Sequence, residues 1–203
     1  MKNAAKYADI LKSLLRSFQK DGGAPPLEKQ EPLKALVRGA MTYDVPDSRA
    51  DDAMKTIERE FVNLNELRVA TQLEVQDMLG QRYPDIEHRV DTITLCLNNI
   101  FEKEHTLSLD RLKTISKKDA RQFLRELPDV SAFVEAYVML FGFETPAVPL
   151  DGESLNYLRE QGMFDEKTTP DDAQRFIENQ LKAEEYYEFF HGLRKAVFNR
   201  KKK

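Results

Sequence analysis

The segment Leu124-Arg-Glu-Leu-Pro-Asp-Val-Ser131 decides how this chain folds. Pro128 cannot continue a helix and it restricts the backbone of Leu127, so the helix that precedes the segment ends here. Asp129 tolerates unusual turn dihedrals, and Ser131 is a residue type that starts a helix by accepting a backbone N–H bond. Apolar residues follow at helical spacing. The segment therefore predicts two helices joined by a tight turn.

The rest of the chain shows the same helical period, and the alternation typical of half-buried strands is scarce. The turns that separate the segments are rich in Gly, Pro and Asp. Helices are expected at 7–18, 33–40, 49–61, 74–79, 86–101 and 134–141, with short ones between 107 and 124 and three more that start near Gly152, Pro170 and Ala183. We therefore predict an all-α fold.

The composition excludes several classes of protein. With 203 residues, 41% of them hydrophobic, the chain can bury a substantial core. No apolar run approaches the ~18 residues of a membrane span, and the charged N-terminus does not resemble a signal peptide. The single Cys96 excludes a disulfide within the chain and a four-cysteine metal site, and the three histidines are too scattered for a metal site. We expect a cytoplasmic protein with no membrane contact, metal or cofactor.

The charge distribution bears on nucleic-acid binding. A net charge of −4 disfavours a strong nonspecific grip on DNA. The stretch from Arg194 to Lys203 is basic, which is typical of a solvated tail and also compatible with phosphate contacts. A group of aspartates, Asp44, Asp47, Asp51 and Asp52, is interpreted as a solvated helix start without a link to other site residues.

The hairpin and the chain that follows it to Asp151 resemble the helix-hairpin-helix motif of endonuclease III and its relatives among the DNA glycosylases. In that family a Leu-Pro-Gly-Val-Gly turn precedes the catalytic region. Residues 36–44 resemble the early helix that reaches into DNA, and residues 88–100 resemble the long helix before the hairpin. Together with 190–192, which resembles the start of the last helix, the likeness covers roughly residues 27 to 197.

The resemblance implies a two-lobed helical bundle with a helix-hairpin-helix motif, built as a single unit over residues 1–203. One lobe would hold residues 30–130, with the hairpin near its end. The second lobe would hold residues 1–29 together with 131–203. Both ends of the chain would then contribute to the same lobe.

The resemblance also implies where a reaction site would lie. Phe133 falls where bifunctional members have the catalytic Lys, and Asp151 follows 18 positions later, the separation expected of the catalytic Asp. In a glycosylase, such an Asp stabilises positive charge on the sugar or activates water. The residues implied to contact DNA are Met41, Tyr43, Leu127, Pro128, Asp129, Val130, Ser131 and Phe133.

Each candidate also has a structural interpretation. Asp151 could simply cap the helix that starts at Gly152. Asp129 and Ser131 could form only a turn and helix start, and Met41 and Tyr43 could belong to the core.

The departures from the family pattern leave the function open. Phe133 cannot form a Schiff base, so lyase chemistry is lost at that position. Asp129 and Ser131 stand where the hairpin has Gly, Met41 stands where Gln is common, and the iron–sulfur cysteines are absent.

Three readings remain. The first is a base-excision repair glycosylase without lyase activity. It would act on damaged or mispaired double-stranded DNA, with Asp151 supporting hydrolysis of the N-glycosidic bond at an extruded base. The second is a catalytically inactive module of the same fold that binds DNA or a protein partner. The third is an unrelated helical adaptor.

Overall fold

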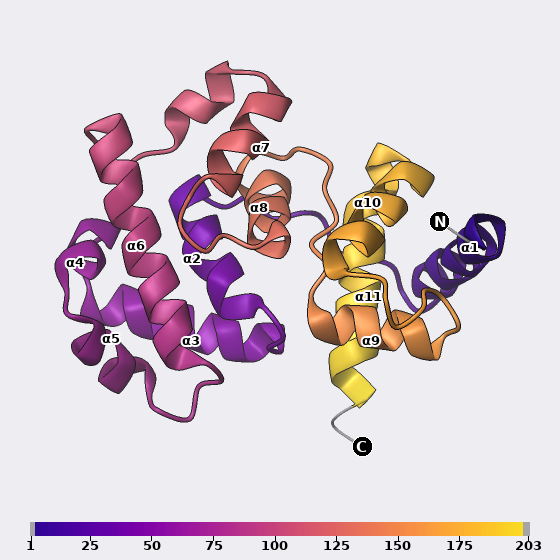
Figure 1. Ribbon diagram of the computed structural model, residues 1–203. Coiled ribbons are helices and arrows are strands. Elements are labelled where there is room, and N and C mark those ends of the chain that lie inside the picture. Colours follow the sequence, from indigo (N-terminus) through magenta and orange to yellow (C-terminus); the bar gives the residue numbers. More distant parts are fainter. Residues whose placement is uncertain (1–2, 201–203) are drawn as a thin grey trace.

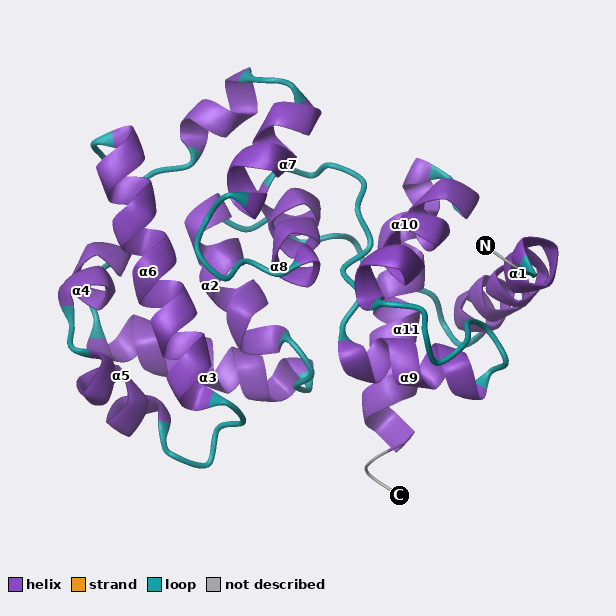
Figure 2. Cartoon of the chain, in the orientation of Figure 1, coloured by secondary structure: helices purple, strands orange, loops and turns teal. Residues whose placement is uncertain are grey.

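A computed structural model describes residues 3–200, and over that range the chain forms helices and loops without strands (Figures 1 and 2). Positions 201–203 of the basic terminal stretch lie outside the described residues. The elements are α1 Ala4–Lys20, α2 Pro32–Thr42, α3 Asp47–Glu60, α4 Leu64–Val69, α5 Gln72–Leu79, α6 Ile86–Glu104, η1 Asp110–Thr114, α7 Lys117–Arg125, α8 Ala132–Tyr137, η2 Val138–Gly142, α9 Gly152–Glu160, α10 Pro170–Gln180, η3 Ala183–Glu185 and α11 Tyr186–Arg200. The predicted all-α fold is confirmed.

The helices gather into two lobes, each with its own apolar core (Figure 1). Lobe one contains α2 to α8 and η2, and its core is formed by residues between Leu33 and Ala147 together with Phe190 of α11. Lobe two contains α1 and α9 to α11, so the two ends of the described chain lie in the same lobe. The sequence placed the boundary at 130/131, whereas the core residues of the two lobes, Phe190 excepted, divide between Ala147 and Val148. The reason is that the segment from Phe133 to Gly142 is buried at every position, and such a helix must be surrounded.

The central helix of lobe one is α2, which packs against α3, α6, α8 and η2. It starts with Pro32 at a position where the missing N–H costs nothing, and the Glu31 side chain accepts from the backbone N–H of Lys34 at 2.9 Å. Gly39 lets α8 approach closely, because a Cβ there would stand 3.2 Å from the Tyr137 ring. This packing fixes the position of the C-terminal end of α2 at the junction of the lobes.

The hairpin forms as its sequence predicts. Helix α7 ends before Leu127, Asp129 adopts a left-handed φ of 55°, and the Ser131 hydroxyl oxygen accepts from the Val134 N–H at 3.3 Å to start α8. The Cys96 thiol of α6 donates to the Pro128 carbonyl at 3.1 Å and anchors the turn. Burial raises the pKa of this thiol to about 12, with Asp129 contributing, so it is unreactive.

Lobe two is held by a close crossing of α1 and α11. A Cβ on Gly192 would stand 2.3 Å from a ring carbon of Phe18, so only glycine fits at this point. Within the described residues, no helix has the length and apolar character needed to cross a membrane.

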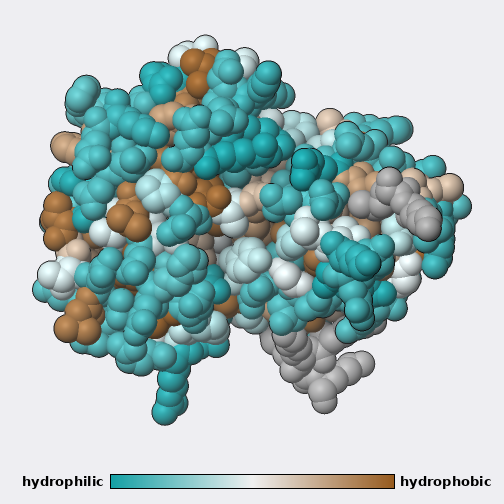
Figure 3. All heavy atoms as spheres, in the orientation of Figure 1, coloured by the Kyte–Doolittle hydropathy of each residue, from teal (hydrophilic) through white to brown (hydrophobic). Residues whose placement is uncertain are grey.

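The surface seen in Figure 3 is mostly hydrophilic, with its apolar side chains in small separate patches, most of them over lobe one. The large apolar side chains that are most exposed lie in the α3–α6 region: Val62, Val69, Leu73, Leu95 and Phe101. Lobe one therefore has scattered apolar exposure at α3–α6, away from the hairpin in sequence.

Candidate functional site

Asp151 lies at the junction of the lobes and is completely buried, with 0% of its surface exposed. It caps α9, because its Oδ1 accepts from the Ser154 N–H at 2.9 Å. Its Oδ2 accepts from the Arg194 guanidinium at 2.6 Å and from the Asp44 N–H at 3.1 Å. Both carboxylate oxygens thus have partners inside the protein, and the capping role expected from the sequence is present.

Arg194 is a residue of this junction that was not predicted from the sequence. The sequence placed it in a basic tail, but its side chain is only 2% exposed. Besides Asp151 it binds the carboxylate of Asp47 at 3.3 Å and donates to the carbonyls of Thr42 and Val45. It therefore ties α11 of lobe two to the end of α2 in lobe one.

A signal for this burial exists in the sequence. Arg194 lies four residues after Phe190 and three before Val197, which are both buried. An arginine on the apolar stripe of a helix must find partners when it is buried.

The structure also corrects the position expected for Asp44. The sequence predicted that it lies in a solvated acidic patch with no link to Asp151. Its backbone N–H instead donates to Asp151, and its Oδ1 accepts from the Glu153 N–H at 2.7 Å. Burial raises the pKa of Asp44, and the nearby Asp151 raises it further. The start of α9 is thus held by two carboxylates that belong to different lobes.

An aromatic cluster occupies the position at which the family resemblance would place a Schiff-base lysine. Phe133 is 1% exposed, and its ring centroid lies 5.4 Å from that of Tyr43 in an edge-to-face arrangement and 6.0 Å from that of Tyr137. Burial raises the pKa of Tyr43, with smaller contributions from Asp44 and Asp151. Phe133 therefore acts as core, and Tyr43 is half-buried beside it.

The remaining candidates divide into buried and accessible residues. Met41 is 0% exposed, and its carbonyl accepts from the Tyr83 hydroxyl at 2.7 Å, so its side chain presents no surface to a partner. Leu127 is buried as well. The residues that reach the surface of the hairpin are Pro128, Asp129, Val130 and Ser131.

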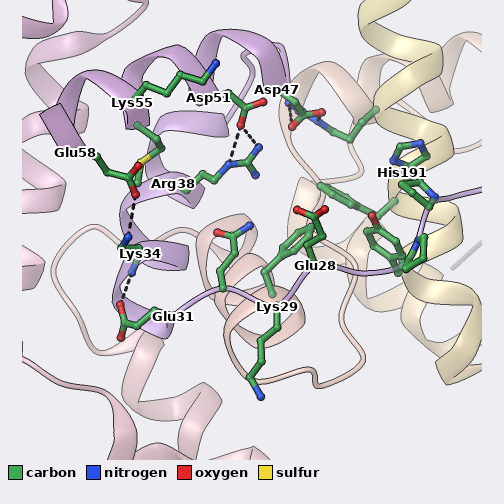
Figure 4. Close-up of a pocket in the computed structure, with 18 residues that line it drawn as sticks. Glu28, Lys29, Glu31, Lys34, Arg38, Asp47, Asp51, Lys55, Glu58 and His191 are labelled. Carbon is green, nitrogen blue, oxygen red and sulfur yellow. Dashed lines mark hydrogen bonds and ion pairs between the residues drawn. The ribbon is translucent and has the colours of Figure 1, made fainter.

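A groove of about 860 Å³ lies between the lobes (Figure 4). Phe141, Tyr187 and Phe190 contribute aromatic rings to its lining. Charged side chains surround them, but many are paired, for example Arg38 with Asp51 and Lys34 with Glu58 at 2.9 Å. Paired charges produce little net field, so this groove has no excess of positive charge to attract phosphate.

Comparisons with known proteins identify the fold. No protein-family profile matches the chain, and no curated protein sequence matches it either. A trapped covalent complex of endonuclease III with DNA superposes with a TM-score of 0.73 at 13% identity, covering 96% of this chain and 86% of that one. The 3-methyladenine DNA glycosylase of H. pylori superposes with a TM-score of 0.70 at 16% sequence identity, covering 97% of this chain and 98% of that one. The 8-oxoguanine glycosylase/lyase of Clostridium acetobutylicum superposes with a TM-score of 0.74 at 14% sequence identity, covering 96% of this chain and 71% of that one.

This protein therefore has the endonuclease III-like fold of the helix-hairpin-helix DNA glycosylases, as its sequence predicted. At these identities the comparisons establish the fold, and the chemistry depends on the residues described above.

Proposed function

We propose that this chain binds double-stranded DNA through its hairpin and does not excise bases. The observation that supports the second part, the absence of base excision, is the junction of Asp151 and Arg194. Both oxygens of the carboxylate are engaged by protein donors, and the side chain has no exposed surface. A carboxylate in this state is a structural ion pair, and because it is fully buried neither a sugar nor water reaches its oxygens.

The second reactive position supports the same conclusion. Schiff-base chemistry needs an amine, and Phe133 offers only an aromatic ring inside a packed cluster. The neighbours of Phe133 on α8 are Ala132, Val134, Glu135 and Ala136, none of which is an amine. The proposal therefore predicts that borohydride forms no covalent adduct between the protein and an abasic duplex.

DNA binding is supported by the accessible part of the hairpin. Structures of the same fold include endonuclease III in complex with DNA and the 8-oxoguanine glycosylase/lyase with double-stranded DNA. In this chain Ser131 accepts from a backbone N–H, so its own hydroxyl hydrogen is free to donate to a phosphate. Asp129 is exposed beside it and would repel that phosphate, which makes the expected binding weak.

The enzymatic alternative is hydrolysis of an N-glycosidic bond at an extruded damaged base, with Asp151 supporting the transition state. The position of Asp151, at the start of α9 and between the lobes, favours it. This route requires Oδ2 to exchange the Arg194 guanidinium and the Asp44 N–H for substrate. Base release that disappears in Asp151→Asn would establish this alternative.

The DNA-binding part is tested by fluorescence anisotropy with a paired duplex at low and moderate salt. Asp129→Asn keeps a residue that tolerates positive φ and removes the charge, so affinity should rise roughly fivefold at low salt, because two charges ~4 Å apart in water interact by about 1 kcal/mol. The gain should shrink as salt rises. Asp52→Asn, a matched change at an exposed position on α3, should have no effect. If neither the unmodified chain nor Asp129→Asn binds the duplex, the proposal of DNA binding is wrong, and binding of a protein partner is the function that remains for this module.

A further inference from the structure

A cavity of about 260 Å³ lies in lobe one, between η1, the start of α7 and the end of η2. Its apolar lining consists of Leu112, Ile115, Ala120, Met139, Gly142 and Phe143. Ile115 and Phe143 are half-buried and form the part of this lining that reaches the surface. The volume is below the roughly 300–1,000 Å³ typical of pockets for drug-sized ligands, so the cavity suits one large apolar side chain.

Among the described residues that line this cavity, every charged one is a lysine. Lys29 approaches from the linker before α2, Lys113 from η1 and Lys117 from α7. The groove between the lobes is lined instead by side chains of both signs. Lys29 pairs with Glu144 and Lys113 pairs with Asp110, but neither of these carboxylates lines the cavity. The charge that faces the cavity is therefore positive.

The first turn of α7 carries two cations without carboxylate partners in residues 3–200, Lys117 and Lys118. A helix dipole places partial positive charge at the N-terminus, so cations in the first turn are unfavourable. The whole segment 111–125 holds six Lys and Arg against one carboxylate, and its three arginines pair with carboxylates of other segments. The two lysines remain as free charges, and a bound anion would compensate them.

An acidic protein segment with one apolar side chain matches both the interior and the rim of this cavity. Protein interfaces combine an apolar centre with a polar rim, and a side chain that fills a pocket at the centre supplies much of the affinity. A DNA backbone offers phosphates to the lysines but no group for the apolar interior. The cavity also lies at the opposite end of α7 from the hairpin, and a helix of nine residues is about 14 Å long.

We propose that this cavity is a docking site for an acidic segment of a partner protein, which inserts one large apolar side chain such as phenylalanine. The inserted side chain occupies the space between Leu112 and Met139. Carboxylates on either side of it pair with Lys117 at the start of α7 and with Lys29 and Lys113 on the rim. This site shares no residue with the hairpin, so the inference does not rest on the proposed DNA binding.

Two synthetic peptides test the cavity: Glu-Asp-Glu-Phe-Glu-Asp-Glu and the same peptide with alanine in place of phenylalanine. Each carries a fluorescent label and is titrated with the full chain at low salt, with anisotropy as the readout. The phenylalanine peptide should bind at least roughly tenfold more tightly, because its ring leaves water for the apolar interior. Nuclear magnetic resonance should show that it shifts the backbone amide signals of Ala120 and Gly142 and leaves that of Ser131 in the hairpin unchanged.

Lys117→Gln tests the charge, since it removes a free cation and keeps a side chain of similar length. Affinity for the phenylalanine peptide should fall roughly fivefold at low salt, as expected for the loss of one ion pair in water. The loss should shrink as salt rises. Lys12→Gln is the matched control, because Lys12 is exposed on α1 in lobe two, and it should leave the affinity unchanged. Neither variant should alter the affinity for a paired duplex.

The docking site is overturned if the two peptides bind equally or not at all, if the signals of Ala120 and Gly142 do not shift, or if the two lysine variants behave alike. It is also overturned if Lys117→Gln weakens duplex binding and leaves peptide affinity unchanged, because the lysines would then serve DNA. Failure of the proposed function is a separate result. A chain that binds the phenylalanine peptide as described but binds no duplex disproves DNA binding at the hairpin and leaves the docking site in place.

Discussion

The junction between the lobes and the first half of α6, beside the hairpin, treat buried polar groups in opposite ways. At the junction, the carboxylate of Asp151 and the guanidinium of Arg194 meet at 2.6 Å, and further backbone groups satisfy both. On α6, the Thr92 hydroxyl is nearly as well buried but has no partner in the protein. Both regions are close to Tyr43, which lines a small cavity together with Thr92 and feels the charge of Asp151.

The difference concerns what each polar group contributes to the stability of the fold. A buried ion pair with all its hydrogen bonds made is stable only as a unit, and loss of one partner leaves an uncompensated charge. A buried hydroxyl without a partner lowers stability slightly, because it has lost its hydrogen bonds to water without gaining others. The ion pair of Asp151 and Arg194 thus holds the two lobes together at the position that resembles a reaction centre.

The largest expected effect comes from Arg194→Met. The variant keeps an unbranched side chain but leaves Asp151 buried without its cation, so the free energy of unfolding should fall by about 3–5 kcal/mol. Urea denaturation followed by circular dichroism measures this loss. Arg175→Met is the matched control, because Arg175 pairs with Asp172 at 3.1 Å on the surface and its side chain is 68% exposed. A loss of similar size in both variants would contradict a structural role specific to the junction.

Asp151→Asn should have the next largest effect. Asn still caps α9, but the charge-assisted bond to Arg194 is weakened, and such bonds contribute about 1.5–3 kcal/mol. Affinity for a paired duplex should stay the same. Asp172→Asn serves as the exposed control. If Asp151→Asn instead has unchanged stability but altered DNA binding, the junction belongs to the ligand site after all.

Two threonine variants give smaller effects of opposite sign. Thr92→Val removes a hydroxyl that has no partner, so stability should rise by up to about 1 kcal/mol. Thr42→Val removes a hydroxyl bonded to the Arg38 carbonyl, so stability should fall by about 1 kcal/mol. Thermal unfolding of both variants without nucleic acid checks the signs. Destabilisation by both changes would mean that Thr92 has a partner in solution, and the contrast between the two regions would disappear.

The smallest effect is the pH dependence that Asp44 adds to the junction. Burial raises the pKa of Asp44 in the folded protein, so the stability that this group contributes is complete below its ordinary pKa of 3.8 and is lost as the pH rises through the raised value. The side chain of Asp44→Asn does not titrate, so this variant does not lose that stability as the pH rises. Its stability relative to the unmodified chain should therefore increase as the pH rises above 3.8, which unfolding curves at several pH values can measure. A constant difference across pH would contradict the raised pKa.

The sequence predicted the helices better than the contacts between them. Helical periodicity and the Leu127-Pro128 turn were sufficient for the all-α fold and the hairpin, since both are local features. Helix α4 was missed because it has six residues and Leu67 alone among them is buried, which leaves no periodic stripe.

The site could be predicted only in part. The family resemblance directed attention to Asp151 and Phe133, and the N-cap role of Asp151 was foreseeable from its residue type. Its other partners were not, because Asp44 and Arg194 lie 107 and 43 positions away in sequence. Counting Arg194 as a tail charge treated a buried residue as a solvated one, which composition alone cannot distinguish.

The central claim, that this fold holds DNA here without cutting it, is tested most directly by base release under single-turnover conditions. An excess of the full chain is incubated at low salt with duplexes that each contain one damaged or mispaired base, and abasic sites are then cleaved by alkali and counted. We predict that the duplexes are bound while abasic sites form at the rate seen without protein, equally for the unmodified chain and Asp151→Asn. Faster base release by the unmodified chain that Asp151→Asn abolishes would contradict it.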